Sequence, residues 1–316
     1  MKKTTLILFF CFSFFKSFSQ QQGLFTQYLY NPTYINPAYS SILEDKTFFF
    51  QNRSQWSNVE GAPSTFFLNY YNPNFLQKLA TGINISNDNI GPFINYSISI
   101  DFSYSVKINE KWNSALGLRI NYNDYQLNQN LWKIYNPNDP LFNLDNNPFN
   151  NNVSIGFGFL LKSNNTYIGI SSTSLYSVKL YEDEISSKND PINYFLLSHS
   201  FILSKHFKIS PGIIIRNFKN LPNQYDLSLN TSIYDKFSLG VSYRLESSVN
   251  AIIGISISEK ILVGYSYDFG ISEINNFSRK NSEVFLKYTF NKTNDLKKPN
   301  DFIPPTAAEK IIKSKE

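Results

Sequence analysis

The sequence is poor in residue types that would each point to a particular chemistry. It holds one cysteine, one methionine and two histidines in 316 residues. Cys11 lies inside an N-terminal apolar run, "LILFFCFSFF", which follows Lys2 and Lys3 and precedes the small residues Ser17 and Ser19. This arrangement is typical of a secretory signal peptide, so we expect residues 1–19 to be removed. The mature chain would then lack a thiol, which excludes disulfides, cysteine-bound metals and a cysteine nucleophile.

Charge is scarce as well. Charged residues make up 17% of the chain, whereas soluble domains usually carry about 25%. Beyond the signal peptide, 26 basic residues face 24 acidic ones, a balance that does not suggest nucleic acid as a partner. His199 and His206 are too few for a histidine metal cage, and no Gly-x-Ser-x-Gly nucleophile elbow occurs. The sequence therefore predicts a protein that is not an enzyme and binds no cofactor.

Long hydrophobic runs are also missing. After residue 20 no apolar stretch reaches the roughly eighteen residues of a membrane helix. Aromatic residues nevertheless reach 17%, with 29 Phe and 21 Tyr. A chain that is exported, apolar in a dispersed way and without a membrane helix fits a closed β-barrel, because a barrel pairs all backbone groups within its sheet.

Residues 94–109, "INYSISIDFSYSVKIN", show the pattern most clearly. Every second residue is apolar or aromatic, and the residues between are polar. Successive side chains of a strand point to opposite faces, so this strand should turn one face to lipid and the other to the barrel interior. Sixteen residues tilted by 45° rise roughly 37 Å, more than the apolar band of about 25 Å, so we expect the strand to protrude.

Alternation predicts an all-β fold, a transmembrane antiparallel β-barrel of about 14 strands. The predicted strands are 46–54, 63–72, 79–87, 93–108, 112–125, 150–162, 165–174, 190–204, 206–218, 224–234, 236–246, 249–258, 260–270 and 282–291. Short connections alternate with long ones, such as 126–149 and 175–189, and only 247–248 is short where a long loop is expected. With the short turns in the periplasm, both termini are periplasmic.

The predicted organisation has four parts. A signal peptide (1–19) precedes a periplasmic or luminal N-terminal segment (20–45), an outer-membrane barrel (46–292) and a polar, proline-containing periplasmic tail (293–316) that we expect to be disordered. A secreted β-sandwich also buries one strand face. Strands of ten or more residues favour the barrel, because sandwich strands average about five or six.

Several motifs give the chain a family resemblance. "LFTQYLYNPTYINPAYS" (24–40), "RSQWSNVEGAPSTFFLNYYNP" (53–73), "NDNIGPFINYSISIDFSYSVKI" (87–108) and "NNVSIGFGFLLKSNNTYIGIS" (151–171) resemble the PorP/SprF family of outer-membrane proteins of type IX secretion and gliding systems in Bacteroidota. Three later motifs, "LPNQYDLSLN", "FSLGVSYR" and "LVGYSYDFGIS", follow in the family's order. One departure lies before the last strand, where Lys280-Asn281-Ser282-Glu283 replaces a Gly-Ser-His-Glu-like turn, so the family's histidine is missing.

The resemblance implies a non-enzymatic barrel that works with periplasmic components of the secretion machinery, such as a lipoprotein, a ring protein or a peptidoglycan-binding protein. It also implies a role in secreting or anchoring a large surface adhesin. The alternative from another class is a passive outer-membrane porin for small solutes.

The segment 24–40 supplies the candidate docking residues. Two Asn-Pro pairs force turns and tyrosines lie between them; the candidates are Gln27, Tyr28, Tyr30, Asn31, Pro32, Tyr34, Asn36, Pro37 and Tyr39. We expect this segment to present a surface to partners at the periplasmic mouth, or alternatively to pack inside the barrel as a plug.

Two further sets complete the candidates. Trp56, Gly61, Ala62 and Pro63 predict a folded loop after the first strand, more probable than a direct ligand contact. Charges on the polar strand faces should form a mutually paired network in the lumen, since unpaired charges are costly there, with a substrate pathway as the rarer alternative. These luminal charges are Asp101, Lys107, Arg119, Arg244, Glu246, Asp268, Glu283 and Lys287.

Overall fold

The computed structural model describes residues 25–76, 79–128, 151–179, 191–219, 221–271 and 281–290. The predicted signal peptide and tail lie outside these residues, as do most of the loops predicted at 126–149 and 175–189. Within the described residues, no helix is long and apolar enough to cross a bilayer.

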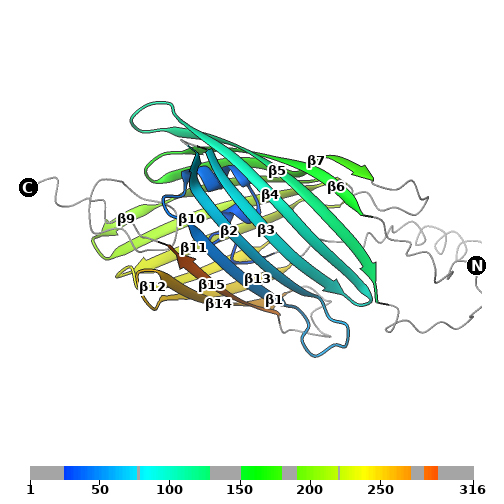
Figure 1. Ribbon diagram of the computed structural model, residues 1–316. Helices are drawn as coiled ribbons and strands as arrows, with labels where there is room; N and C mark the ends of the chain where they lie inside the picture. Colours follow the sequence, from blue (N-terminus) through cyan, green and yellow to red (C-terminus); the bar gives the residue numbers. More distant parts are fainter. Residues whose placement is uncertain are drawn as a thin grey trace, which may run out of the picture.

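The described chain forms one antiparallel sheet that closes on itself (Figure 1). Its strands are β1 (Thr47–Ser54), β2 (Ser64–Leu76), β3 (Leu79–Ile90), β4 (Phe93–Lys107), β5 (Asn113–Leu127), β6 (Asn152–Lys162), β7 (Thr166–Lys179), β8 (Ile192–His199), β9 (Phe201–Ser204), β10 (Phe207–Phe218), β11 (Gln224–Ile233), β12 (Phe237–Arg244), β13 (Ser248–Ser256), β14 (Ile261–Gly270) and β15 (Asn281–Thr289). Each strand pairs with its neighbour in sequence, except that β8 and β9 each pair with β10, and the pairing of β1 with β15 closes the barrel. Because β8 and β9 both pair with β10 in one line, the barrel has fourteen strand positions, which confirms the predicted number.

Most predicted strand boundaries agree with the structure to within a few residues. The strand predicted at 190–204 is interrupted at Ser200, which divides it into β8 and β9. The strand predicted at 165–174 continues to Lys179, past a register shift against β6. The short connection predicted at 247–248 is residues 245–247, because β12 already ends at Arg244.

The connections divide the barrel into two ends. We call the turn end the one that carries residues 108–112, 163–165, 205–206, 234–236 and 257–260. We call the loop end the one that carries residues 55–63, 91–92 and 245–247. At the turn end, Tyr234 and Asp235 both have positive φ, 52° and 50°, the backbone shape of a tight hairpin turn.

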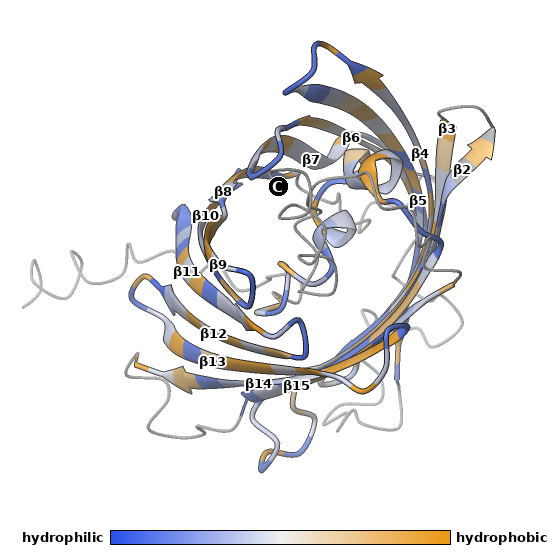
Figure 2. Ribbon diagram, turned by 90° about the vertical axis from the view of Figure 1, so that its left-hand side faces the viewer, coloured by the Kyte–Doolittle hydropathy of each residue, from blue (hydrophilic) through white to orange (hydrophobic). Residues whose placement is uncertain are grey.

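The outer face of the barrel is apolar. On β4, Ile98 and Ile100 are 51% and 44% exposed, whereas Asp101, the residue after Ile100, is fully buried. Figure 2 shows the same alternation of hydrophobic and hydrophilic residues around the wall. An apolar surface of this extent is the face that hydrocarbon covers in a membrane barrel.

The outer face of three strands changes toward the loop end. At the loop end, β3, β4 and β5 place Asn87, Tyr96 and Asp124 side by side in register, and the next outward residues are Asn89, Ile94 and Gln126. Polar residues thus become frequent on the outer face toward this end of the three strands. The protrusion of the strand around 94–108 from the membrane stays a prediction.

Candidate functional site

The chain before β1 lies inside the barrel. We call residues 25–45 the N-terminal plug; it contains two 3₁₀ helices, η1 (Pro32–Tyr34) and η2 (Pro37–Ile42). Each helix starts with the proline of an Asn-Pro pair, a position where the missing N–H costs nothing. The Asn36 side chain accepts a hydrogen bond from the Ala38 N–H at 3.0 Å, which caps η2.

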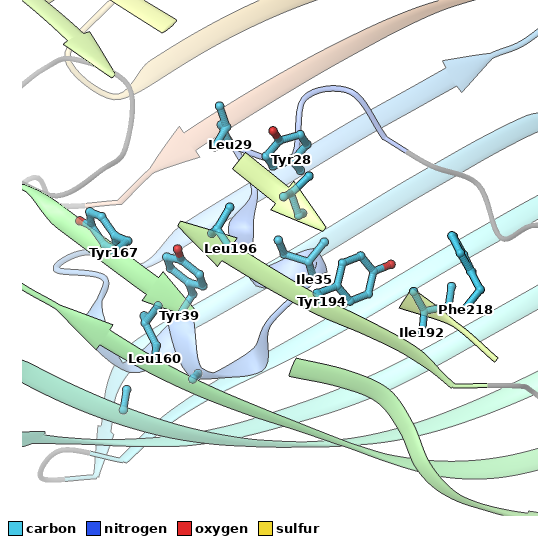
Figure 3. Close-up of a cluster of buried hydrophobic side chains, with 13 residues drawn as sticks. Tyr28, Leu29, Ile35, Tyr39, Leu160, Tyr167, Ile192, Tyr194, Leu196 and Phe218 are labelled. Carbon is cyan, nitrogen blue, oxygen red and sulfur yellow. The ribbon is translucent and has the colours of Figure 1, made fainter. Parts of the chain in front are cut away.

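Apolar and aromatic side chains hold the plug against β5 to β8 and β10. Figure 3 shows this cluster, in which the Tyr39 ring stacks on Tyr167 with centroids 5.9 Å apart. Its buried members are Tyr28, Leu29, Ile35, Ala38, Tyr39, Ala115, Leu160, Tyr167, Ile192, Tyr194, Leu196, Ile214 and Phe218. A smaller buried cluster joins the plug to other strands of the wall through Tyr30, Phe49, Ile252, Leu262 and Phe285. The hydrophobic core among the described residues is thus the contact between the plug and the barrel wall.

A group of buried charges holds the start of the plug. The Glu283 carboxylate on β15 accepts hydrogen bonds from the backbone N–H groups of Thr26 (2.7 Å) and Gln27 (3.1 Å), and it forms an ion pair with Arg53 on β1. Arg53 also lies 2.8 Å from Asp268 on β14, which accepts a hydrogen bond from the Thr26 hydroxyl at 2.8 Å. One carboxylate thereby connects the plug to the strands that close the barrel.

A second group of charges lies on the neighbouring strands. Asp226 on β11 stands 3.7 Å from Arg216 on β10 and 3.3 Å from Arg244 on β12. The Arg216 guanidinium also lies 5.6 Å from the centroid of the Tyr28 ring of the plug. With Arg53, Asp268 and Glu283, the two groups hold three guanidinium groups and three carboxylates, so their charges balance, as burial requires.

A third pair joins η1 to the opposite side of the wall. Arg119 on β5 binds Asp101 on β4 through two hydrogen bonds, Nε to Oδ1 at 2.6 Å and Nη2 to Oδ2 at 2.7 Å. The same guanidinium donates to the backbone carbonyls of Thr33 (2.7 Å) and Tyr34 (2.8 Å). A planar group with five donors can bridge wall and plug in this way.

The structure brings most of the predicted luminal charges inside the barrel. Asp101, Arg119, Arg244, Asp268, Glu283 and Lys287 are all buried. The prediction is wrong for the other two. Lys107 is the last residue of β4 and is exposed, and Glu246 lies exposed in the tight turn after β12 with φ of 57°.

Sequence reasoning missed three members of the network, Arg53, Arg216 and Asp226. Each of them lies between two outward residues of its strand. The alternation of inward and outward positions could therefore have predicted that they face the lumen. In β1, however, Phe48, Phe49 and Phe50 are consecutive, and this run hides which face is internal.

Two glycines make room for the plug. Gly117 on β5 and Gly158 on β6 are direct partners across the sheet. A Cβ atom at Gly117 would lie 2.3 Å from the Ala38 nitrogen, and one at Gly158 would lie 2.0 Å from the Asn36 side-chain oxygen. Only glycine permits the plug to approach the wall this closely.

The docking candidates require a correction. All nine are buried inside the barrel except Tyr34, which is partly buried. Their burial agrees with the alternative prediction, in which the segment packs inside the barrel as a plug. Buried side chains do not form a surface for a partner. Burial also raises the pKa of the Tyr30 phenol from 10.0 to about 12, although a hydrogen bond to Ser238 opposes the shift.

The loop signature forms a compact connection at the loop end. Trp56 has φ of 48° and donates its backbone N–H to Asn281 on β15, and Gly61 has φ of 73°. The Gly61 carbonyl accepts a hydrogen bond from the Gly91 N–H at 2.8 Å, so this loop rests on the turn between β3 and β4. Ala62 and Pro63 then lead into β2, in agreement with a folded loop.

The departure from the family pattern lies outside the lumen. Asn281 and Glu283 are buried on the inner face of β15, and Ser282 between them is on the other face, paired with Ser54 and Tyr267. A histidine at Ser282 would therefore not reach the plug.

Between the plug and the loop end lies a small polar cavity of about 90 Å³. Its lining includes Tyr34, Asp88, Arg119, Asn121 and Tyr194. The described residues contain no group of three or more histidine, cysteine or acidic side chains that could hold a metal ion. The site offers a packed, charge-paired plug with this polar cavity beside it.

A closed antiparallel barrel with an apolar outer face and a polar interior defines this protein as an integral outer-membrane β-barrel. The comparisons agree at the level of fold. The chain is similar to the CymD monoaromatic hydrocarbon channel (TM-score 0.51, 14% identity, 86% of this chain and 95% of that one). It is also similar to the Pseudomonas putida toluene transporter TodX (0.49, 10%, 82% and 94%) and to Acinetobacter baumannii Omp33 (0.46, 11%, 78% and 99%).

The family model described as type IX secretion system membrane protein PorP/SprF matches residues 17–288. The chain therefore belongs to the PorP/SprF family, as its motifs indicate. Among curated proteins, none matches the sequence significantly. The family is one of membrane proteins of a secretion system rather than of enzymes.

Proposed function

We propose that this barrel assists the type IX secretion system through protein contacts: it docks periplasmic components of the machinery and helps to secrete or anchor a large surface adhesin. The observation that carries the proposal is the family match over residues 17–288. The plug supports it, because a lumen filled by a buried segment with paired charges is poorly suited to the passage of solutes.

The proposal includes an orientation. The turn end faces the periplasm and the loop end faces outward, since short turns are periplasmic in bacterial outer-membrane barrels. Periplasmic partners would then include a lipoprotein, a ring protein or a peptidoglycan-binding protein that meets the turn end.

The experiment is a chromosomal deletion of this chain, complemented by the wild type or by a variant without residues 25–40. The surface proteins released by brief protease treatment of intact cells are compared, and the tagged barrel is purified in mild detergent. We expect the deletion to remove a large surface protein and the wild-type barrel to co-purify with a periplasmic protein. Normal surface proteins in the deletion strain would contradict the proposal.

A further inference from the structure

The strand β9 differs from every other strand that the structure describes. All four of its residues, Phe201–Ser204, are exposed, and among the described strands only β10 pairs with it. On its other side, the last bond to β7 is from the Ser200 N–H to the Asn165 carbonyl, 2.8 Å. The turn between β6 and β7 ends there, and beyond it no strand among the described residues pairs with this edge of β9.

The side chains of β9 are exposed on both faces of the strand. Phe201, Ile202 and Leu203 are 51%, 41% and 61% exposed, so both faces of the strand are apolar and uncovered. Ile202 has the parity of the buried Ser200 and pairs with Lys208 on β10. A residue on the inner face that is nevertheless exposed must lie beyond the barrel interior.

The edge of β9 is open to hydrogen bonding. Successive N–H groups of a strand point to alternate sides, so the Ile202 N–H points to the same side as that of Ser200, where no described strand follows. Natural proteins blunt such an edge with charges, proline, bulges or a very short strand. β9 has only four residues and its register against β10 shifts between Phe207 and Lys208, but its sequence, "FILS", contains no charge and no proline.

Basic and aromatic groups surround this edge. His206, in the turn after β9, stacks on Tyr234 with ring centroids 4.6 Å apart, and its carbonyl accepts the Tyr234 N–H at 2.8 Å. Tyr234 is 67% exposed and has a positive φ, an uncommon conformation for a bulky residue. Lys205 and Lys236 lie in the same two turns, together with the acidic Asp235.

We propose that the open edge of β9 is a docking site for an extended segment of a partner protein, which adds to the sheet as a further strand. The segment would alternate apolar residues that cover Phe201, Ile202 and Leu203, and would carry acidic residues that face Lys205 and Lys236. Main-chain bonds would supply affinity and the side chains specificity. This inference rests on the proposed function, because it names the surface through which a periplasmic component docks.

A second copy of this chain fits the edge poorly. Two copies in one membrane are related by rotation about an axis along the membrane normal. Because barrel strands are tilted by about 35–45° from this axis, the two copies of β9 would cross each other and could not pair along their length. A segment of a water-soluble protein has no such restriction.

The test combines two backbone variants with site-specific photo-crosslinking in cells. A photoreactive p-benzoylphenylalanine replaces Leu203, or Leu197 on the bilayer-facing side of β8 as a control. Each is combined with Ile202→Pro, which removes the N–H, or with Ile202→Val, which keeps it. We expect position 203 to give an adduct with an acidic, alternating apolar segment of another protein, reduced about tenfold by Ile202→Pro and retained in Ile202→Val.

An adduct only with a second copy of the chain or with its own residues 291–316 would overturn the inference, as would equal adducts in the two variants. The heat-modifiable mobility of the barrel shows that each variant is folded. Normal surface proteins in the Ile202→Pro strain contradict this inference alone, whereas normal surface proteins in the deletion strain contradict the proposed function.

Discussion

At the scale of single residues, the plug depends on close approach. Gly117 and Gly158 permit backbone and amide atoms of the plug to lie directly against the wall, within the distance that any Cβ atom would occupy. Gly212 on β10 is less confined, because the nearest atom to a Cβ there would be the Ser228 hydroxyl at 3.0 Å.

Replacement of Gly158 by alanine tests this contact. The new methyl group would collide with Asn36, so we expect a loss of about 1–3 kcal/mol in the free energy of unfolding, measured by urea titration in detergent, and faster protease cleavage within residues 25–45. The matched control is Gly212→Ala, whose Cβ atom would lie 3.0 Å from the movable Ser228 hydroxyl. Equal losses in the two variants would contradict the assignment.

The Tyr30 phenol gives a prediction about pH. Because burial raises its pKa to about 12, the folded state holds this proton through a range where the unfolded chain loses it, with a pKa near 10. The associated stability is complete below about pH 10 and is lost as the pH rises toward 12. The difference in 295 nm absorbance between wild type and Tyr30→Phe should titrate with a midpoint near 12; a midpoint near 10 would show that the side chain is exposed.

At the scale of elements, Glu283 connects three of them: the plug, β1 and β15. Without Glu283, the buried Arg53 keeps only Asp268 as an ion-pair partner, and the N–H groups of Thr26 and Gln27 lose their acceptor; breaking a buried pair costs about 3–5 kcal/mol. We therefore expect Glu283→Leu to destabilise the barrel by about that amount in urea titrations.

The double variant Arg53→Met with Glu283→Leu is the control. It should lose less than the sum of the two single variants, because each of these already removes the Arg53–Glu283 pair, and the loss of Arg53 beside Asp268 is common to Arg53→Met and the double variant. Additive losses would show that Arg53 and Glu283 do not act as a pair.

The same scale shows what the sequence could predict. Alternation in β4 and β5 depends only on neighbouring residues and on the face that lipid covers, so it gave those strands to within about two residues. The plug depends on contacts such as Thr26 with Glu283, separated by 257 positions, and no local pattern encodes them. The Asn-Pro turns show only that the segment bends, and that is compatible with a surface or with a plug.

The separate strand β9 could not be predicted from the sequence either. The apolar run "FIL" at 201–203 interrupts the alternation. The run is nevertheless compatible with one continuous strand at 190–204, so the sequence does not reveal the break. The break at Ser200 and the end of the neighbouring hairpin at Asn165 appear only when both strands are placed side by side.

At the scale of the whole molecule, the barrel is a wall in the membrane with its own N-terminal segment as its core. The apolar outer face meets lipid, and the inner face meets the plug, so the parts left to contact other proteins are the two ends. This division separates the proposed role from that of a diffusion porin, whose function needs the interior to be open.

Conductance in a planar lipid bilayer tests this central claim most directly. We expect the wild-type barrel to give no steady open-channel current, and the variant without residues 25–42 to give stepwise currents, provided that both show the heat-modifiable mobility of a folded barrel. A large steady current from the wild type would contradict the account.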